Sequence, residues 1–566
     1  MPVFYPFLIA IIPILHLLVS NPGQARFSDA IIPMLISLGF ALVAFVALRL
    51  ILKNWEAAGL IVSLFLVLFY SFGYMVDLSP DVRVAYYTFS AFGIIMAIGI
   101  FLLVKFRGRL QQNPKHKTYV VAATLSLVGM TLLVSVVSLV SSERGRLGMH
   151  LLLAAFCIIL FAGVFLLAKF RDRLRNLSRI LNVVAAALMV LILVNLFTSG
   201  TPKFVTVGKD EVRRTAESTN VALPDPANLP DIYYIILDGY ASNRSLEKFY
   251  GFDNSKFTGW LESRGFYVAH ESHSNYFMTA LSLAASLNMK YINYLSEEVG
   301  ELSNDRTALS KMTEDNGLVH FLKSRGYKFA FFESNWGGTN KNRNADISVS
   351  GGSWLKDEFI VALLKTTALR GVFRQQVEKE GLFTREGVLR AFSMIPRIRE
   401  EVDGPVFVFA HILPPHPPFL FDRNGNPASG SKGTWGETDR YLDQLMFVNG
   451  KTREMVDQIL ANSEKPPIII IQADHGPLIT NDADFDFPPN PGAEVAEIRT
   501  GILNAYYLPG GKEFLYEGIS PVNSFKVVLN RLFGTGFKML DDRSYVSSYE
   551  KPYSFKDITG TLDGMK

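Results

Sequence analysis

The chain has 566 residues, of which 49% are hydrophobic and 19% charged, with a mean hydropathy of +0.21 and a formal net charge of +4. This composition is too apolar for an ordinary soluble protein of this size, and its uneven distribution makes length a poor guide to domain number. The positive charge lies largely in short basic loops of the first part, so it does not indicate a nucleic-acid partner. The single cysteine, Cys157, lies in an apolar run, which excludes an intrachain disulfide.

The first 200 residues contain long uncharged runs, and a helix of about 20 apolar residues crosses a bilayer. They predict about seven transmembrane helices, over residues 3–20, 30–48, 57–76, 84–104, 118–140, 150–168 and 180–198. Alternate loops carry twelve Lys and Arg residues in one set (49–56, 105–117, 169–179) and four in the other (21–29, 77–83, 141–148). The positive-inside rule places the first set in the cytoplasm. The amino terminus is then cytoplasmic and everything after residue 200 extracytoplasmic, although a miscount by one span would reverse the latter placement.

Apart from His16, the predicted spans contain no internal acid or base. A proton-coupled transporter would bury ionisable groups within its spans, so this half is interpreted as an anchor or a lipid-facing dock. Residues 201–230 are polar with a Pro-rich end and are typical of a connector. We therefore expect a membrane domain over 1–200, a juxtamembrane linker over 201–230 and an extracytoplasmic catalytic domain over 231–566.

Beyond residue 230, short β-rich runs alternate with amphipathic stretches. The runs predict buried strands over 231–239, 327–334, 405–413, 466–476 and 504–510, with helical patterns between them at 255–266, 316–327 and 443–463. Strands that are apolar on both faces and separated by helices are typical of a mostly parallel sheet covered on each side. The predicted fold is an all-α membrane domain followed by an α/β domain.

Three predicted strands end in side chains that can bind a metal or a phosphate. Asp238 closes the first, His411 closes "VFVFAH", and Asp474 and His475 follow the isoleucines of "IIIIQADHG". A single Asp after a strand is usually a helix cap or a turn residue. Ligands of such sheets, however, bind beyond the carboxyl ends of the strands. The coincidence at three strand ends therefore predicts a site at this edge.

Thr279 begins the helix-favouring part of "SNYFMTALSLAASLNMKY" (274–291). A threonine at this place is most often only an N-cap. The functional alternative is a nucleophile, whose hydroxyl needs a metal or a base to lower its pKa. The positive end of the helix would favour both an alkoxide and an anionic phosphoryl group. Together with Asp238, Asp474 and His475 it would form an oxygen- and nitrogen-donor set suited to one divalent ion, zinc or manganese.

These motifs resemble the alkaline phosphatase superfamily, in particular its membrane-anchored branch of lipoteichoic acid synthases and phosphoethanolamine transferases. The transferases carry T-x-x-S-V-P, H-x-x-x-x-H-G-P and D-H-G, preceded by a strand that ends in an acid. Here the counterparts are "TALSLA" at 279–284, His411 and His416 in "HILPPHPPF", "DHG" at 474–476 and Asp238 in "YYIILDGY". The resemblance extends over roughly 231–540, and the whole layout is similar to bacterial sulfatase-like membrane proteins.

The sequence departs from the transferases at three points. They have a further histidine shortly after D-H-G, whereas no histidine follows His475 here. Their first acid is Glu rather than Asp, and their outer domain contains disulfides that this chain cannot form. The resemblance therefore implies fold and chemistry, and not their particular lipid substrate.

The resemblance implies a two-step phosphoryl transfer. Thr279, bound to the metal with Asp238, Asp474 and His475, would displace the leaving group to give a phosphothreonine, which an acceptor then attacks. His411 and His416 would contact the phosphoryl oxygens or protonate the leaving group; the alternative is that they are loop histidines beside prolines. Three further candidates for the substrate pocket are Asn275, Tyr276 and Trp336, of which Trp336 could equally serve packing.

The predicted function is transfer of a phosphoryl-linked headgroup from a lipid-type donor to a lipid-linked or glycan acceptor of a bacterial-type cell envelope. Hydrolysis of phosphoesters is the main alternative, because water can replace the acceptor. A sulfatase ranks lower, since the outer domain has no cysteine and no serine in the C/S-x-P-x-R pattern that is converted to formylglycine. An inactive membrane scaffold or a sensor is the non-enzymatic alternative.

Overall fold

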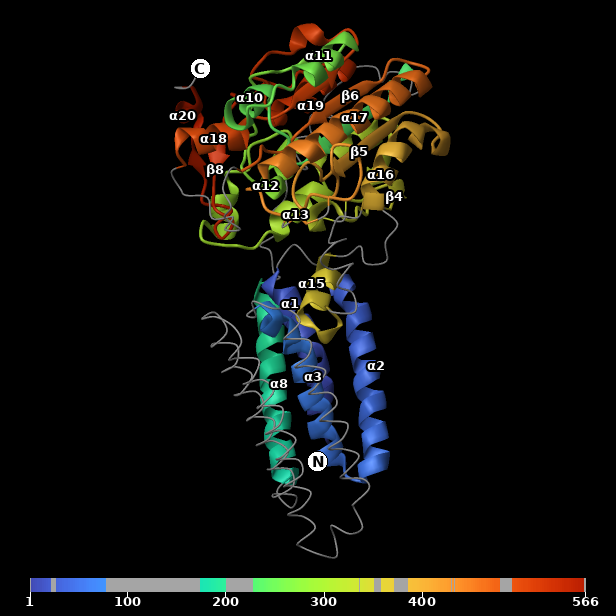
Figure 1. The fold of residues 1–566 in the computed structure, drawn as a ribbon, viewed down its shortest axis with the longest axis vertical. Helices are drawn as coiled ribbons and strands as arrows, with labels where there is room; N and C mark the ends of the chain where they lie inside the picture. The colour runs from blue at the N-terminus through green and yellow to red at the C-terminus, as the bar shows by residue number, and fades with distance from the viewer. Residues whose placement is uncertain are drawn as a thin grey trace, which may run out of the picture. The chain divides into compact units, whose positions relative to one another are not determined.

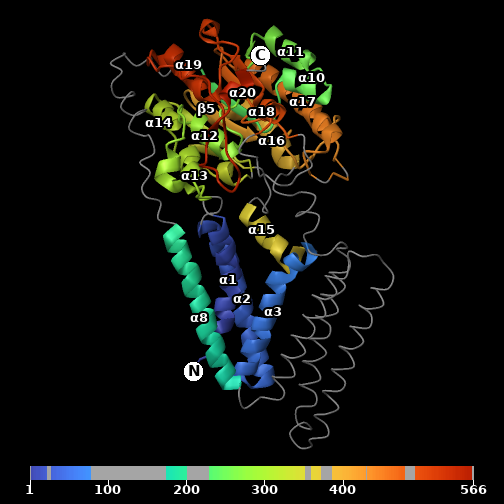
Figure 2. The same cartoon turned by 90° about the vertical axis from the view of Figure 1, so that its left-hand side faces the viewer.

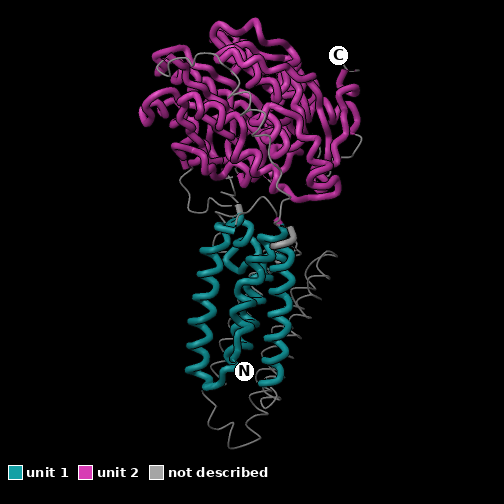
Figure 3. The backbone as a smooth tube through the Cα atoms, turned by 180° about the vertical axis from the view of Figure 1, so that it is seen from behind, with its two compact units in different colours: residues 1–20, 26–198, 359–379 teal, residues 21–25, 199–358, 380–566 magenta. Residues whose placement is uncertain are grey.

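The computed structural model describes residues 2–21, 27–77, 174–199, 228–334, 336–350, 358–370, 385–428, 430–431, 433–478 and 491–563. The predicted spans 84–104, 118–140 and 150–168 and most of the linker lie outside the described residues. The chain divides into two compact units (Figure 3). Unit 1 comprises residues 1–20, 26–198 and 359–379, and unit 2 comprises residues 21–25, 199–358 and 380–566.

Unit 1 is helical in its described part. Its elements are α1 (Tyr5–Ser20), α2 (Phe27–Leu52), α3 (Trp55–Asp77), α8 (Leu174–Ser199), α15 (Glu358–Thr366) and η5 (Ala368–Arg370). Segments of α2, α3 and α8 are long and apolar enough to cross a membrane, whereas α1 is a shorter apolar helix. Large apolar side chains are exposed along α2, such as Ile32 at 67% and Val43 at 70%. Such an exposed apolar surface fits an integral membrane protein.

The helices of unit 1 are joined by hydrogen bonds of buried polar side chains. Ser37 on α2 donates to the carbonyl of Ala10 on α1 at 2.7 Å, and Tyr70 on α3 donates to Ser37 at 2.8 Å. These bonds satisfy polar groups that would be costly to leave without partners in lipid.

Unit 2 is built on a mixed sheet that has seven strands within the described residues, in the order β2-β7-β6-β1-β5-β3-β4. The strands are β1 (Ile232–Leu237), β2 (Tyr267–Val268), β3 (Lys328–Phe332), β4 (Ile347–Val349), β5 (Val406–Ile412), β6 (Ile468–Gln472) and β7 (Asn504–Tyr507). β6, β1, β5, β3 and β4 are parallel, β7 runs antiparallel to β6, and the edge strand β2 runs antiparallel to β7. The prediction of a mostly parallel sheet is confirmed.

Helices cover both faces of this sheet (Figures 1 and 2). They are α10 (Asn243–Tyr250), α11 (Ser255–Ser263), α12 (Thr279–Ser286), α13 (Thr307–Glu314), α14 (Gly317–Ser324), α16 (Arg385–Met394), α17 (Thr438–Asn462), α18 (Ala493–Thr500), α19 (Pro521–Phe533) and α20 (Thr559–Asp563). Short 3₁₀ and π turns and a second, two-stranded sheet complete the unit: η3 (Ser296–Gly300), η4 (Gly337–Thr339), η7 (Ile395–Glu401), η8 (Lys512–Phe514), β8 (Tyr545–Val546) and β9 (Lys556–Asp557).

Strand β1 shows why the sheet is covered on both sides. Its six residues are all buried. Tyr233, Ile235 and Leu237 belong to the core on one face, with side chains of α17, and Ile232, Tyr234 and Ile236 belong to the core on the other, with side chains of α14 and α19. Because side chains alternate along a strand, a run without polar residues requires two cores, each Ile or Leu contributing about 1.5–3 kcal/mol. This burial fixes the position of the residue that follows the strand.

Candidate metal centre and nucleophile

The strand register brings the predicted ligands to one edge of the sheet. β1 lies between β5 and β6, with Ile236 paired to His411 on one side and to Gln472 on the other. Asp238 follows β1 and Asp474 follows β6, so both emerge at the carboxyl ends of adjacent parallel strands. The backbone N–H of Gly239 donates to Oδ1 of Asp474 at 3.2 Å, which ties the two strand ends together.

Asp238, Asp474 and His475 form a compact group of potential ligands. One ligand atom from each lies within 4.8 Å of the other two, and all three residues are buried. Nε2 of His475 is 3.5 Å from Oδ1 of Asp238 and 3.3 Å from Oδ2 of Asp474. Asp238 is more than two hundred positions from Asp474 and His475 in the sequence, and the fold brings the three residues together.

The ring of His475 is oriented by its other nitrogen. Nδ1 lies 3.0 Å from the carbonyl oxygen of Gly476. A carbonyl only accepts, so Nδ1 carries the proton and Nε2 presents a lone pair to the two carboxylates. Burial, together with the charge of Arg499, holds the pKa of His475 well below its usual value. The imidazole is thus neutral at physiological pH, which is the form that binds metals.

The carboxylate oxygens of this group lie close to one another in a buried place. Oδ1 of Asp238 and Oδ2 of Asp474 are buried without a hydrogen-bond partner among the described residues. Burial and the charge of Asp238 raise the pKa of Asp474. Burial also opposes ionisation of Asp238, but the surrounding histidines keep its pKa below the usual range. Lone pairs facing one another in a dry site are costly unless a cation lies between them. The residues therefore fit a divalent metal ion.

Thr279 completes this arrangement. It is the first residue of α12, and the residue before it, Met278, makes no side-chain cap. Oγ1 of Thr279 lies 3.1 Å from Nε2 of His475. Since that nitrogen carries no proton, the hydroxyl donates to it. Thr279 is partly buried, whereas Asp238, Asp474 and His475 are buried.

Two glycines allow the loops to approach this closely. A Cβ on Gly476 would lie 2.0 Å from the carbonyl oxygen of Ile498. Gly239 has φ +70°, and a Cβ there would lie 2.7 Å from the ring of Trp435. Both positions therefore require glycine, which accounts for the Gly in "LDGY" and in "DHG".

The two predicted catalytic histidines lie in different environments. The side chain of His411 is fully buried, with Nε2 3.3 Å from Oδ2 of Asp238. His416 is partly buried, and its ring lies 4.7 Å from that of Trp435 and 6.1 Å from that of His475. Its Nδ1 is 2.5 Å from the carbonyl of Pro417, so Nε2 is left without a proton. His416 is thus the more accessible of the two, whereas His411 is buried beside Asp238.

Asn275 and Tyr276 are engaged elsewhere. Asn275 is buried and bonds Ser520, the carbonyl of Arg543 and the N–H of Val522. Tyr276 is buried and donates to Asn293 at 2.7 Å. Both residues tie the nucleophile segment to later parts of the chain and do not contact the ligand group.

Trp336, the third pocket candidate, does lie beside the site. Its ring meets that of His411 edge-on, with the centroids 5.6 Å apart.

Sequence reasoning missed a buried arginine beside the ligands. Arg499, on α18, is 2% exposed and donates to the carbonyls of Phe277 at 2.9 Å and Gly476 at 2.7 Å. It thereby joins the segment before Thr279 to the D-H-G turn. Burial lowers its pKa only to about 10, so it stays charged at neutral pH. In the sequence, its only signal was a lone charge between Ile498 and Thr500 near a helix end.

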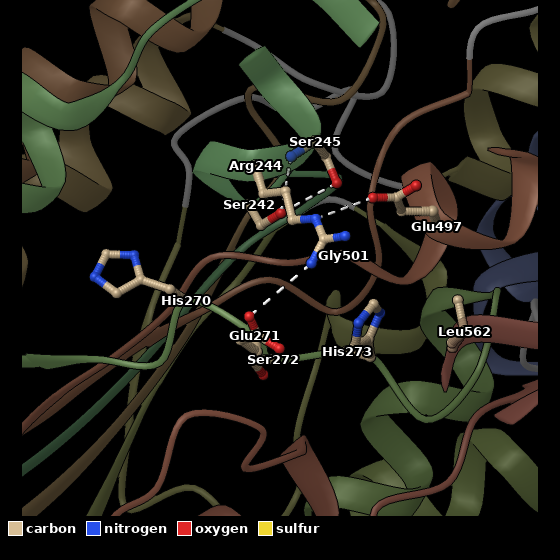
Figure 4. Close-up of a pocket in the computed structure, with 10 residues that line it drawn as sticks. All are labelled: Ser242, Arg244, Ser245, His270, Glu271, Ser272, His273, Glu497, Gly501 and Leu562. Atoms are coloured by element: carbon tan, nitrogen blue, oxygen red, sulfur yellow. Dashed lines mark hydrogen bonds and ion pairs between the residues drawn. The ribbon is translucent and has the colours of Figure 1, made fainter. Parts of the chain in front are cut away.

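A second polar pocket shows the opposite pattern. In Figure 4 the side chain of Arg244 lies between Glu497 and Glu271, from which it is separated by 3.3 and 3.9 Å. Lys248 also reaches Glu497, at 2.5 Å. The acids here are matched by bases of the same chain, so the pocket does not require a bound ion.

Comparisons with known proteins agree with this architecture. The family model described as Sulfatase matches residues 232–525. No curated protein gives a match.

Among solved structures, the chain is similar to the periplasmic domain of EptC from Escherichia coli in complex with zinc. They share 13% identity with a TM-score of 0.39, over 59% of this chain and 96% of that one. It is also similar to the integral membrane protein EptA, a lipooligosaccharide phosphoethanolamine transferase from Neisseria meningitidis. The identity there is 14% and the TM-score 0.36, over 83% and 94% of the two chains. Because the family model matches the segment that contains the ligand group and Thr279, the chain belongs to the sulfatase family, whose members are enzymes of the alkaline phosphatase superfamily.

Proposed function

We propose that the protein is a metal-dependent membrane phosphotransferase. It moves a phosphoryl-linked headgroup from a lipid-type donor to a cell-envelope acceptor through a phosphothreonine at residue 279. One observation carries the proposal: the hydroxyl of Thr279, a partly buried residue, lies 3.1 Å from Nε2 of His475 in a buried His–Asp–Asp group, two of whose carboxylate oxygens have no hydrogen-bond partner among the described residues. A nucleophile in contact with a cation site is the arrangement that phosphoryl transfer requires.

The metal would be held by Asp238, Asp474, His475 and Thr279, and the two carboxylates and one imidazole suit zinc or manganese. When bound, it supplies positive charge that lowers the pKa of the threonine hydroxyl and stabilises the charge of the phosphoryl oxygens. The protein orients the donors before the reaction, since the Gly476 carbonyl fixes the tautomer of His475. Arg499 adds a buried positive charge close to the developing negative charge.

The first step forms a bond from Oγ1 of Thr279 to phosphorus and breaks the bond from phosphorus to the leaving oxygen of the donor. The proton that leaves Thr279 balances the one that the leaving oxygen takes up, and we assign its transfer to Nε2 of His416, the ring nitrogen without a proton. In the second step an acceptor hydroxyl attacks the phosphothreonine, the P–Oγ1 bond breaks and Thr279 regains its proton. Water in place of the acceptor gives hydrolysis with the same residues.

Phosphoryl rather than sulfuryl chemistry follows from the residue at the start of α12. The formylglycine of sulfatases derives from a cysteine or a serine, whereas this chain has threonine there and its one cysteine is Cys157. The apolar helices of unit 1 favour a substrate that resides in the membrane. The basic loops of the first 200 residues support an amino terminus in the cytoplasm and a catalytic domain, over 231–566, outside it.

The test is mass spectrometry of the intact, purified chain after incubation with membrane phospholipids and the metal. We expect an added mass at Thr279 that equals the transferred group. Stoichiometric metal with no adduct from any phospholipid would instead favour a hydrolase of soluble esters. For the orientation, a cysteine placed at Ser548 in a Cys157→Ser background should react with a membrane-impermeant maleimide in intact cells, and protection from it would contradict the placement.

A further inference from the structure

We propose that hydrogen bonds from Ser334 to Thr339 and from Thr339 to His411 form a directed chain that orients the ring of His411 against Asp238 and thereby sets the affinity of the metal centre. The inference rests on the proposed function, because it concerns the same metal. It assigns Thr339 as a positioning residue. Neither Ser334 nor Thr339 carries a motif in the sequence.

The chain runs from the end of β3 to the end of β1. Oγ of Ser334 lies 2.6 Å from Oγ1 of Thr339, which lies 2.8 Å from Nδ1 of His411. On the other side of the ring, Nε2 of His411 is 3.3 Å from Oδ2 of Asp238, close enough for electrostatic contact but without hydrogen-bond geometry. Thr339 and the side chain of His411 are fully buried.

The direction of each bond follows from the chemistry at the two ends. An ionised carboxylate only accepts, so the nitrogen that faces Asp238 carries a proton and Nδ1 of His411 is the acceptor. Thr339 must then donate its single proton to Nδ1. Ser334 in turn donates to Thr339, and it accepts the backbone N–H of Trp336 at 3.1 Å.

This polarity positions the carboxylate of Asp238. Oδ2 faces Nε2 of His411, and Oδ1, for which the described part of the chain offers no hydrogen-bond partner, faces Nε2 of His475 at 3.5 Å. His411 is not among the residues whose ligand atoms lie within 4.8 Å of one another. We therefore assign it to the support of a ligand rather than to the ion. Groups that orient metal ligands in this way typically change metal affinity by about 10- to 100-fold.

Replacing the Thr339 hydroxyl by a methyl group would remove the donor to His411 without leaving a cavity. In Thr339→Val a methyl group replaces Oγ1, and Nδ1 of His411 loses its donor. The ring can then carry its proton on Nδ1 and turn a lone pair toward Asp238, which repels the carboxylate. Thr339→Ser keeps the hydroxyl and should restore the chain.

The experiment measures Zn²⁺ and Mn²⁺ affinity of the full chain in detergent by competition with a chromogenic chelator, so no turnover is required. Thr339→Val should bind about 10- to 100-fold more weakly, and Thr339→Ser should stay within about threefold of wild type. Thr313→Val is the matched control, because Thr313 is also buried and its hydroxyl bonds only a helical carbonyl, Leu309, at 3.0 Å. It should bind as wild type does.

Three outcomes would overturn the inference. Wild-type affinity in Thr339→Val, or equal losses in Thr339→Val and Thr313→Val, would refute the chain while leaving the metal centre intact. A wild-type chain that binds neither ion would refute the metal centre and this inference with it. Absence of a phosphothreonine adduct in a chain that binds metal would count against the proposed reaction only, since the affinity comparison does not depend on it.

Discussion

Strand β1 has an aspartate at each end, and the two carboxylates differ in their hydrogen-bond and ion-pair partners. Asp231, before the strand, accepts the N–H of Val406 through Oδ1 at 2.9 Å, and its Oδ2 lies 3.7 Å from Arg399. Asp238, after the strand, has an oxygen that finds no hydrogen-bond partner among the described residues and faces other potential ligand atoms. The residue type and the strand are the same. What distinguishes a structural carboxylate from a ligand is whether the chain itself satisfies both of its oxygens.

We expect the largest effect when the hydroxyl of Thr279, the proposed nucleophile, is removed. Thr279→Ala should lower turnover by roughly 10⁴-fold or more, as removal of a nucleophile does in other enzymes. It should abolish the covalent adduct while metal content stays nearly intact, because three ligands remain. Activity with a lipid donor, intact mass and bound metal are measured on the same sample.

Ser282→Ala is the control for Thr279→Ala. Ser282 lies on the same helix, is buried, and bonds only the carbonyl of Tyr276 at 3.0 Å. It should keep its activity. An active Thr279→Ala variant would remove the nucleophile assignment.

The next largest effect is expected on metal affinity, when the aspartate after β1 is changed. Asp238→Asn should weaken metal binding by more than about 100-fold, the upper end of what loss of a supporting residue causes. The amide keeps the shape but presents one oxygen instead of two and no charge. Metal retained after dialysis against a chelator is the measurement. Retention equal to wild type would show that the ion, if bound, lies elsewhere.

The sequence predicted those parts of the site that the backbone alone positions. Asp238, Asp474 and His475 follow central strands, and Thr279 begins a helix, so strand order and register determine where they lie. The fold class was predicted for the same reason, since apolar runs on both faces of a strand require two cores.

Residues that act through side-chain direction could not be predicted. Thr339 and Arg499 become part of the site only because folding turns them toward His411 and toward two carbonyls. Asn275 was predicted to line the substrate pocket because it is near Thr279 in the sequence. In the structure its amide instead donates to Ser520. The hydrophobic periodicity and the composition of a sequence indicate which residues are buried. They do not indicate which atoms a buried polar side chain contacts.

Arg499 offers an intermediate effect that separates charge from geometry. Arg499→Lys keeps the positive charge near the carboxylates, but an ammonium cannot reproduce the planar fork that bonds the carbonyls of Phe277 and Gly476. We expect turnover to fall about tenfold, the effect of about 1.4 kcal/mol in barrier, with a lowered Tm. Arg499→Met, which removes both, should fall further. Equal activity of wild type and Arg499→Lys would show that only the charge matters. Steady-state rates and thermal unfolding of both variants decide this.

The smallest effect is expected at the other end of β1, and it carries a pH signature. Burial raises the pKa of Asp231, opposed by the Val406 N–H and by Arg399. The folded chain thus binds this proton more tightly than the unfolded chain. The stability it contributes at low pH is therefore lost as the pH rises from about 4 through the raised pKa.

In Asp231→Asn the side chain cannot ionise, so the loss of stability at high pH is removed, and the amide oxygen still accepts from the N–H of Val406. The contact with the exposed Arg399 that is given up is worth less than about 1 kcal/mol. At pH 7 the variant should therefore be as stable as wild type or more stable, by up to about 1 kcal/mol, and this advantage should vanish near pH 4. Thermal unfolding at the two pH values measures the difference. Metal affinity should be unchanged, because neither oxygen of Asp231 faces the ligand group. A loss of metal affinity in Asp231→Asn would mean that the charge of a β1 aspartate matters wherever it lies, and the distinction between satisfied and unsatisfied carboxylates would fail.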